Sequence, residues 1–120
     1  MPRDPRAFLW DAEEAATSVA AFIEGRSREA YLADRMLRSA VERQCEILGE
    51  ALNRLSRATP ELASRIPELS RAVAFRNLLI HGYATVDDAT VWRVVTEDLP
   101  VLAAHVSKLL QALGDGNRGD

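Results

Sequence analysis

The chain has 120 residues, of which 48% are hydrophobic and 28% are charged, and its formal net charge is −3. This length suits one domain, and the hydrophobic share argues against a wholly disordered chain. No run of about 18 uncharged apolar residues is present, and the first residues have no signal-peptide character. A single cysteine, Cys45, excludes an internal disulfide, and two histidines leave little material for a zinc site. We therefore expect a soluble cytoplasmic protein that is not a general nucleic-acid coat.

The charge is unevenly distributed along the chain. Residues 26–83 carry a net charge of +3, whereas the two ends together carry −6. Fourteen of the fifteen basic residues are arginine, whose forked guanidinium suits phosphate or carboxylate partners. The alternative interpretation is that arginine is simply the preferred cation of this proteome.

The spacing of apolar residues predicts helices throughout. Asp4-Pro5 is typical of a helix start, and Gly25 is expected to end that first helix. Ser27 is expected to begin a second, longer helix. Its apolar positions recur at steps of three and four, which predicts one buried face: Leu37, Val41, Cys45, Leu48, Leu52 and Leu55.

The second half of the chain continues the helical pattern. Thr59-Pro60 and Ile66-Pro67 predict connectors around a short helical turn, followed by a helix from about Pro67 to His81. Asp87 or Asp88 is expected to cap the last helical region, which we expect to be kinked near Pro100. Its apolar positions again recur at steps of three and four: Val91, Val95, Leu99, Leu102, Val106, Leu109 and Leu113.

The sequence contains no run of alternating apolar and polar residues, the pattern that predicts a strand. We therefore expect an all-α bundle of four to five helices. One domain is predicted over residues 1–113, and residues 114–120 are predicted to form a flexible C-terminal tail.

Polar side chains that suit phosphate chemistry gather at one predicted helix end. Arg76, Asn77, His81 and Tyr83 lie within eight residues. An imidazole can act as a general acid or base near neutral pH, and a guanidinium can neutralise charge on a phosphate, so no metal or cofactor is needed. Arg76 and His81 are about 140° apart around a helix. They converge only if the helix loosens near Gly82, if the long arginine wraps round, or if a second subunit completes the site. A structural role for this arginine and histidine is the alternative.

The run Arg76-Asn77-Leu78-Leu79-Ile80-His81-Gly82-Tyr83 resembles the Arg-x4-His-x-Tyr motif of HepT-type toxins in the HEPN superfamily of helical proteins. The likeness extends over roughly residues 6–112. Other segments resemble the family in the same order, namely Val41 to Gly49-Glu50-Ala51, Leu55-Ser56, Ile66-Pro67, Val86-Asp87, Trp92 and Asp98-Leu99-Pro100. The chain departs from the family pattern at Glu68, where an aromatic residue is frequent, and at Ala74-Phe75.

This resemblance implies a dimeric, metal-independent endoribonuclease that acts on RNA as the toxin of a type VII toxin–antitoxin system. By analogy Arg76 and His81 are catalytic, Asn77 supports them, and two copies of the motif line one cleft of a homodimer. The implied partner is an MntA-like minimal nucleotidyltransferase, which uses ATP to transfer AMP to Tyr83 and so inactivates the toxin.

Two other functions are open from the sequence. The chain is alternatively a non-catalytic helical subunit that binds nucleotide or presents substrate to a nucleotidyltransferase, or an inert bundle used for assembly. Packing is the alternative role for Tyr83, and Cys45 is also expected to be a core residue. Trp10 and Trp92 are expected to make core or dimer contacts rather than to stack on bases.

Three glutamates, Glu42, Glu46 and Glu50, follow one another at i,i+4 spacing. They are interpreted as an ion-paired face or, alternatively, as the source of a carboxylate that orients Arg76 or His81. His105 is expected to lie at the surface without polar partners.

Overall fold

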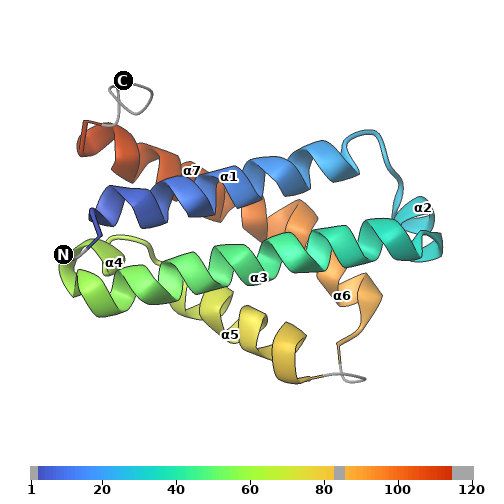
Figure 1. Cartoon of the computed structure of the whole chain (residues 1–120). Helices are drawn as coiled ribbons and strands as arrows, with labels where there is room; N and C mark the ends of the chain where they lie inside the picture. Colours follow the sequence, from blue (N-terminus) through green and yellow to red (C-terminus); the bar gives the residue numbers. More distant parts are fainter. Residues whose placement is uncertain (1–2, 83–85, 115–120) are drawn as a thin grey trace.

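The computed structural model of the chain describes residues 3–82 and 86–114. Over these ranges the protein is all-α, as predicted, and contains no strand. Helix α1 (Pro5–Ile23) packs against α3 (Arg35–Ala58) on one side and against α7 (Leu99–Ala112) on the other. These three helices enclose the core, and Figure 1 shows them lying side by side along the long dimension of the molecule.

The ends of α1 follow local sequence chemistry. The Asp4 carboxylate accepts a hydrogen bond from the backbone N–H of Arg6 at 2.9 Å, and Pro5 occupies the first helical position. Because proline has no N–H to lose and its φ is already helical, that position favours it. Gly25 has φ +73° just beyond the helix, a conformation that glycine adopts without steric cost. The predicted start and end of this helix are therefore confirmed.

The prediction of one long helix from Ser27 is wrong in one respect, because the structure has two helices that are separated at Asp34. Ser27 caps only the short α2 (Arg28–Ala33), accepting a hydrogen bond from the N–H of Ala30 at 3.0 Å. Asp34 has an extended backbone and caps α3 by accepting a hydrogen bond from the N–H of Leu37 at 3.0 Å. A second N-cap side chain thus starts a new helix within a sequence whose apolar period continues across the break.

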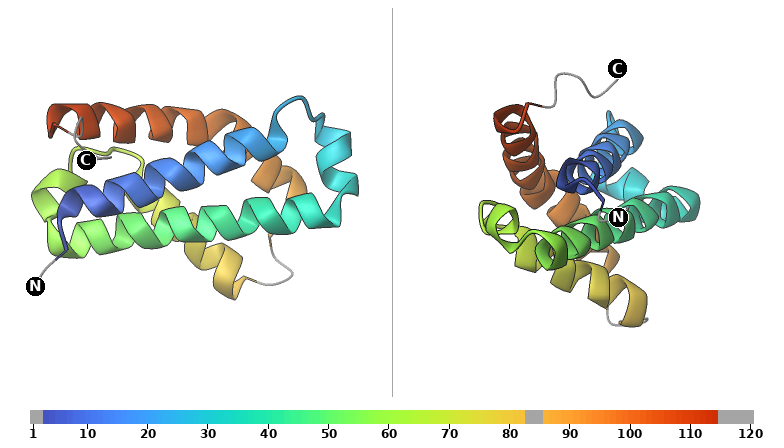
Figure 2. Two further views of the ribbon diagram at one scale, coloured as in Figure 1. Left: turned by 45° about the horizontal axis from the view of Figure 1, so that its top comes forward. Right: turned by 60° about the vertical axis from the view of Figure 1, so that its left-hand side comes forward.

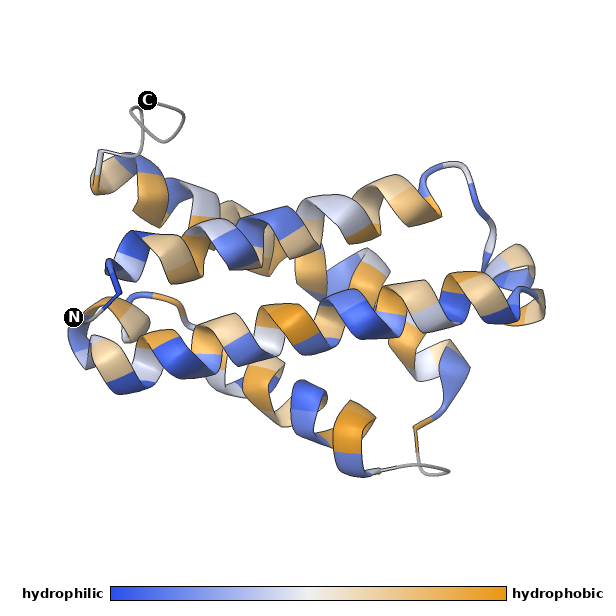
Figure 3. Ribbon diagram, in the orientation of Figure 1, coloured by the Kyte–Doolittle hydropathy of each residue, from blue (hydrophilic) through white to orange (hydrophobic). Residues whose placement is uncertain are grey.

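The apolar stripes predicted for α3 and for the last helical region are confirmed as core. Every member is buried except Leu113, which is partly buried against the core. Tyr31 of α2 is fully buried and its ring lies 5.2 Å from that of Trp92, centroid to centroid. Figure 3 shows hydrophobic and hydrophilic residues alternating along each long helix, as expected for amphipathic helices that bury one side.

The short α4 (Pro60–Ala63) lies between the two predicted connectors, and α5 (Leu69–His81) follows it. Figures 1 and 2 show α5 on the opposite side of α3 from α1. None of its residues is buried, in contrast to eight in α3. Helix α5 is therefore attached to the bundle along one side and open on the other.

The last helical region begins with α6 (Asp88–Arg93), which Asp87 caps by accepting a hydrogen bond from the N–H of Ala89 at 3.3 Å. A π-helical segment, η2 (Val94–Asp98), then joins it to α7. Pro100 has no N–H to give to the carbonyl of Thr96, so regular α-helical bonding is lost there. The helical run changes direction at this segment (Figure 2), and the kink predicted near Pro100 is a π-helical turn immediately before it.

Gly114 is the last residue that the structure describes, so the rest of the predicted tail, residues 115–120, lies outside the described residues. In the part of the chain that is described, no helix is long and apolar enough to cross a membrane.

Candidate active site

Helix α5 lies so close to α3 at Gly49 that a side chain would not fit there. A Cβ atom at this position would lie 2.4 Å from the Cβ of Arg76 and 3.1 Å from the carbonyl oxygen of Ala72. Contacts this short require one helix to move. Gly49 therefore allows the backbone of α3 to lie directly beneath Arg76, and the carboxylate of the next residue, Glu50, comes within reach of that arginine.

Arg76 is held by charge rather than by a complete set of hydrogen bonds. Its side chain is only 15% exposed, and its Nη1 lies 3.8 Å from Oε1 of Glu50, which is too long for a hydrogen bond. Its Nε is buried and has no hydrogen-bond partner among the described residues. The other oxygen of Glu50 lies 3.7 Å from Nε of Arg54. Glu50 thus holds two guanidinium groups close together, and Arg76 keeps donors that an anion could use.

Asn77 and His81 lie on the side of α5 that faces away from α3, and both are exposed. The helix stays regular to its end, where the N–H of Gly82 donates to the carbonyl of Leu78 at 2.6 Å. Arg76 extends to Glu50 on α3 and is about 140° around the axis from His81. Neither of the two ways in which one chain was expected to bring arginine and histidine together, a loosened helix or a wrapped arginine, occurs here.

Tyr83, the predicted AMPylation site, lies in the segment 83–85, which is outside the described residues. The residue before it, Gly82, ends α5 with right-handed backbone angles (φ −81°, ψ −18°). It therefore ends the helix without using the left-handed conformation open to glycine.

A charged pocket of about 330 Å³ borders Arg76 on one side of α5. Its walls come from the start of α1 and from one face of α3, and it contains four arginines and three carboxylates. We call it the arginine pocket; its charged residues are Arg3, Arg43, Arg54, Arg76, Asp11, Glu46 and Glu50, and its apolar residues include Phe8, Ile47 and Ile80.

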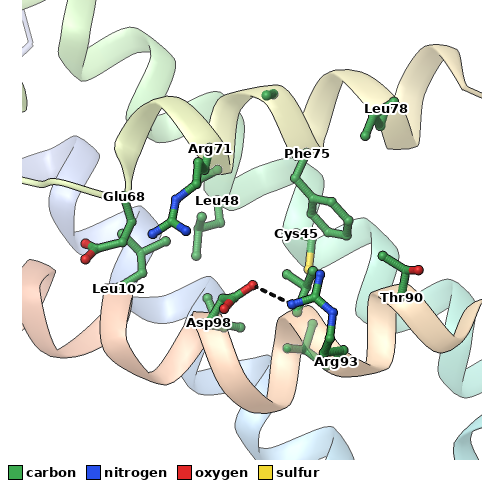
Figure 4. Close-up of a pocket in the computed structure, with 15 residues that line it drawn as sticks. Cys45, Leu48, Glu68, Arg71, Phe75, Leu78, Thr90, Arg93, Asp98 and Leu102 are labelled. Carbon is green, nitrogen blue, oxygen red and sulfur yellow. Dashed lines mark hydrogen bonds and ion pairs between the residues drawn. The ribbon is translucent and has the colours of Figure 1, made fainter.

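A second pocket of about 310 Å³ lies on the other side of α5, between it and the run from α6 to α7. Figure 4 shows Phe75 pointing from α5 toward Cys45 of α3, with the Arg93–Asp98 ion pair on the opposite wall. We call it the apolar groove, since carbon atoms form most of its surface. Burial raises the pKa of the Cys45 thiol to about 12, so this group is protonated at neutral pH and is not a nucleophile.

The glutamate series divides between the two roles that the sequence left open. Glu50 contacts Arg76, whereas Glu46 pairs with Arg43 of its own helix at 3.2 Å. Glu42 lies toward Asp88, and its pKa is raised, mainly by burial. One carboxylate of the three is therefore beside the motif, and it contacts the arginine.

Two features were missed in the sequence. His105 was expected to be without polar partners, but its Nδ1 lies 2.8 Å from Oε1 of Glu68, at the start of α5. The close approach at Gly49 was not predicted either. A glycine inside an otherwise favourable amphipathic helix, at a cost of about 1 kcal/mol relative to alanine, is the signal that could have indicated it.

No group of three or more His, Cys, Asp or Glu side chains that could hold a metal ion occurs among the described residues. The polar side chains on α5 and on the facing part of α3 are instead arginines, an amide, an imidazole and carboxylates, with Arg76 and His81 on different sides of α5. Such a set can bind an anion, stabilise developing negative charge and move a proton.

Comparison with known proteins gives the family. Residues 12–109 match the family model described as "Ribonuclease HepT-like". The chain belongs to the HepT-like ribonuclease family. It is 35% identical over 104 residues to the protein named "Putative RNase MJ1380" of Methanocaldococcus jannaschii, covering 87% of this chain and 94% of that one. It is also 34% identical over 111 residues to "Probable ribonuclease HepT" of Thermococcus cleftensis, covering 91% and 98%.

No solved structure matches the chain. This protein is a HepT-like ribonuclease of the HEPN superfamily, and its candidate site residues lie inside the matched region. Gly49, Glu50, Arg76 and His81 all lie between residues 12 and 109.

Proposed function

We propose that this chain is a metal-independent endoribonuclease toxin that cleaves RNA as a homodimer, with Arg76 and His81 as its catalytic residues and Asn77 in support. The observation that carries the proposal is the divided site of the single chain. Arg76 is partly unsatisfied on one side of α5, and His81 is exposed on another. Of the three ways in which Arg76 and His81 could be brought together, the one that remains is a second subunit.

The proposed chemistry needs one proton-transfer group and one cation. The 2′-hydroxyl of RNA attacks the adjacent phosphorus while His81 takes up the hydroxyl proton. The bond from phosphorus to the 5′ oxygen then breaks as His81 returns this proton to that oxygen, which leaves a 2′,3′-cyclic phosphate and a free 5′-hydroxyl. Arg76 neutralises the charge that builds up on the phosphoryl oxygens. Its low exposure strengthens this interaction, because less water competes with the phosphate for the guanidinium.

The open side of α5 supports the dimer. Asn77 and His81 stand there beside Leu78, whose side chain is 52% exposed. A two-fold axis near this surface would bring the His81 of one subunit toward the α5 of the other. The one cleft between the subunits would then contain the motif residues of both chains.

Single substitutions test the catalytic assignment. We expect Arg76→Ala and His81→Ala each to lower the rate of RNA cleavage by about 10²- to 10⁴-fold without loss of the folded state. The measurement is cleavage of labelled RNA in the presence of EDTA, with circular dichroism to check folding. Wild-type cleavage that EDTA abolishes, or variants as active as the wild type, would contradict the proposal.

Mixing the two inactive variants tests whether the site is shared. In a dimer formed from one Arg76→Ala chain and one His81→Ala chain, the shared cleft keeps one of its two arginine–histidine pairs, with the arginine from one chain and the histidine from the other. Random pairing is expected to restore roughly a quarter of the wild-type activity. If the mixture is no more active than either variant alone, each site belongs to a single chain.

The regulation of the toxin is the second part of the proposal. We propose that an MntA-like nucleotidyltransferase antitoxin transfers AMP from ATP to the hydroxyl of Tyr83, with release of pyrophosphate. Tyr83 is two residues from His81, so the added phosphate would repel the RNA backbone and the nucleotide would block access to it. Intact mass after co-expression with the partner enzyme should show added AMP on the wild type. An adduct that persists in Tyr83→Phe would contradict this site.

A further inference from the structure

The arginine pocket contains more positive groups than the proposed cleavage step uses. Arg43, the Glu50 position and Arg54 lie on one face of α3, at steps of seven and four residues, and all three line the pocket that Arg76 borders. Arg43 and Arg54 are eleven residues apart, or about 16 Å along the helix axis. The pocket is therefore long enough to follow a nucleic-acid backbone over more than one nucleotide.

Among the described residues, the arginines at the rim, Arg43 and Arg54, each form an ion pair within α3. The side chains of Arg43 and Arg54 are 68% and 61% exposed, and their carboxylate partners, Glu46 and Glu50, lie on the same helix. Ion pairs of this kind contribute little to stability, because water screens them and two flexible side chains must be ordered. Exchange of these carboxylates for a phosphate therefore costs the protein little.

The alternative interpretation is a solvated ion-paired face with no ligand. Two observations favour a ligand. The charged residues line a concave pocket rather than a flat or convex surface. In addition, the Nε of Arg76 is buried there without a hydrogen-bond partner in the described structure, and an unpaired buried donor is unfavourable until an acceptor arrives.

Glu50 links the rim to the catalytic arginine. One of its oxygens lies near Arg76 and the other near Arg54, so the two guanidinium groups stand on either side of one carboxylate. An anion that enters the pocket meets both arginines together. Guanidinium groups bind phosphate through paired N–H donors, which makes an RNA phosphate a better partner than a simple halide.

We propose that Arg54 and Arg43 form a phosphate-binding subsite beside Arg76, which takes the RNA phosphates flanking the one that is cleaved. This inference rests on the proposed ribonuclease function and extends it to substrate binding. Arg54 contacts the phosphate next to the scissile one, and Arg43, on the other side of the Glu50 position, contacts a phosphate in the opposite direction along the RNA. Neither takes part in bond breaking, so both act on affinity.

The test compares Arg54→Ala and Arg43→Ala with Arg57→Ala, an exposed arginine of the same helix that does not line the pocket. We expect the two pocket variants to raise KM for a single-stranded RNA oligonucleotide about tenfold each while kcat changes little. Arg54→Lys should fall between Arg54→Ala and the wild type. Arg57→Ala should match the wild type.

Binding is measured separately in a His81→Ala background, where the oligonucleotide is expected to stay intact. The slope of log Kd against log salt concentration should fall by about 0.7 for each lost phosphate contact. If wild-type protein cleaves RNA but the pocket variants keep the KM and salt slope of Arg57→Ala, the subsite is wrong and the ribonuclease function stands. If RNA binds through Arg54 but is not cleaved, the ribonuclease proposal fails and the subsite stands. No RNA binding by the wild type overturns both.

Discussion

Helices α3 and α5 pack against each other but differ in how much of the fold depends on them. Helix α3 buries eight residues and starts from a side-chain cap at Asp34. Helix α5 buries none and starts after Glu68 without a side-chain cap hydrogen bond. The motif residues Arg76, Asn77 and His81 lie on α5. Stability and proposed chemistry thus reside in neighbouring helices that meet at Gly49, and substitutions on each helix should affect different measurements.

The largest expected difference between α3 and α5 is in the stability lost when an apolar side chain is shortened to alanine. Leu52 of α3 is fully buried, so Leu52→Ala should lower the free energy of unfolding by about 2–5 kcal/mol through lost transfer energy and a cavity. Leu79 of α5 is only partly buried, and Leu79→Ala should cost about 1–2 kcal/mol. Urea denaturation of both variants measures the two values. Equal losses would show that α5 is as integral to the fold as α3.

Gly49 tests the contact between the two helices. Gly49→Ala should destabilise the protein by about 1–3 kcal/mol despite the better helix propensity of alanine, because the new Cβ lies 2.4 Å from that of Arg76. RNA cleavage should fall as well, since α5 must shift. The measurements are thermal denaturation and RNA cleavage.

A double-mutant cycle isolates the clash at this position. Arg76→Gly removes the opposing Cβ, so its coupling energy with Gly49→Ala should be favourable by about 1–2 kcal/mol once the cost of each single substitution is subtracted, whereas Arg76→Ala should show no such coupling. Cleavage should stay low in both double variants, because both lack the guanidinium. If Arg76→Gly and Arg76→Ala gave the same coupling energy, the contact between α3 and α5 would not depend on the Cβ atoms at positions 49 and 76.

The contrast also explains what could be predicted from the sequence. The stripe from Leu37 to Leu55 is buried as expected, because burial of a packed helix follows a 3.6-residue period that is visible in the chain. The break at Asp34 was not predicted. A single capping residue interrupts the helix while leaving that period nearly unchanged.

Contacts between residues that are far apart in the sequence could not be predicted in this way. Glu68 meets His105 and Glu50 meets Arg76 across 37 and 26 positions of the chain. No local spacing encodes such pairs, because they depend on how the helices are placed against one another. Family resemblance identified the motif residues, but only the packing at Gly49 showed which of three glutamates lies beside the arginine.

A smaller effect is expected at the start of α3. Asp34→Ala removes the acceptor for the N–H of Leu37 and should cost about 1 kcal/mol. Asp34→Asn keeps an oxygen in place and should cost much less. Urea denaturation measures both variants, and RNA cleavage should be unchanged in each, because the cap is at the far end of α3 from Gly49. A loss of cleavage without a loss of stability would show that this end of α3 acts on the site.

The smallest expected effect is on the pH dependence of stability at Glu42, a partly buried carboxylate of α3 whose negative charge is unfavourable. Burial raises its pKa above the ordinary 4.5, with further contributions from Asp88 and Glu46. The folded state therefore holds the proton more tightly than the unfolded state, and this residue's contribution to stability falls as the pH rises from about 4.5 through the raised pKa.

Glu42→Gln removes the ionisation and should make the protein more stable than the wild type at pH 7. The advantage should shrink toward zero below pH 4.5, where the wild-type carboxyl is protonated in both states. Chemical denaturation at pH 4 and pH 7 measures it, with the exposed Glu14→Gln of α1 as the control. A Glu42→Gln variant that is less stable than the wild type at pH 7 would mean that the ion pairs of α3 outweigh the burial of this carboxylate. Stability would then depend on charge on both sides of α3, and the division between a packed α3 and an open α5 would be weaker than the burial of apolar residues indicates.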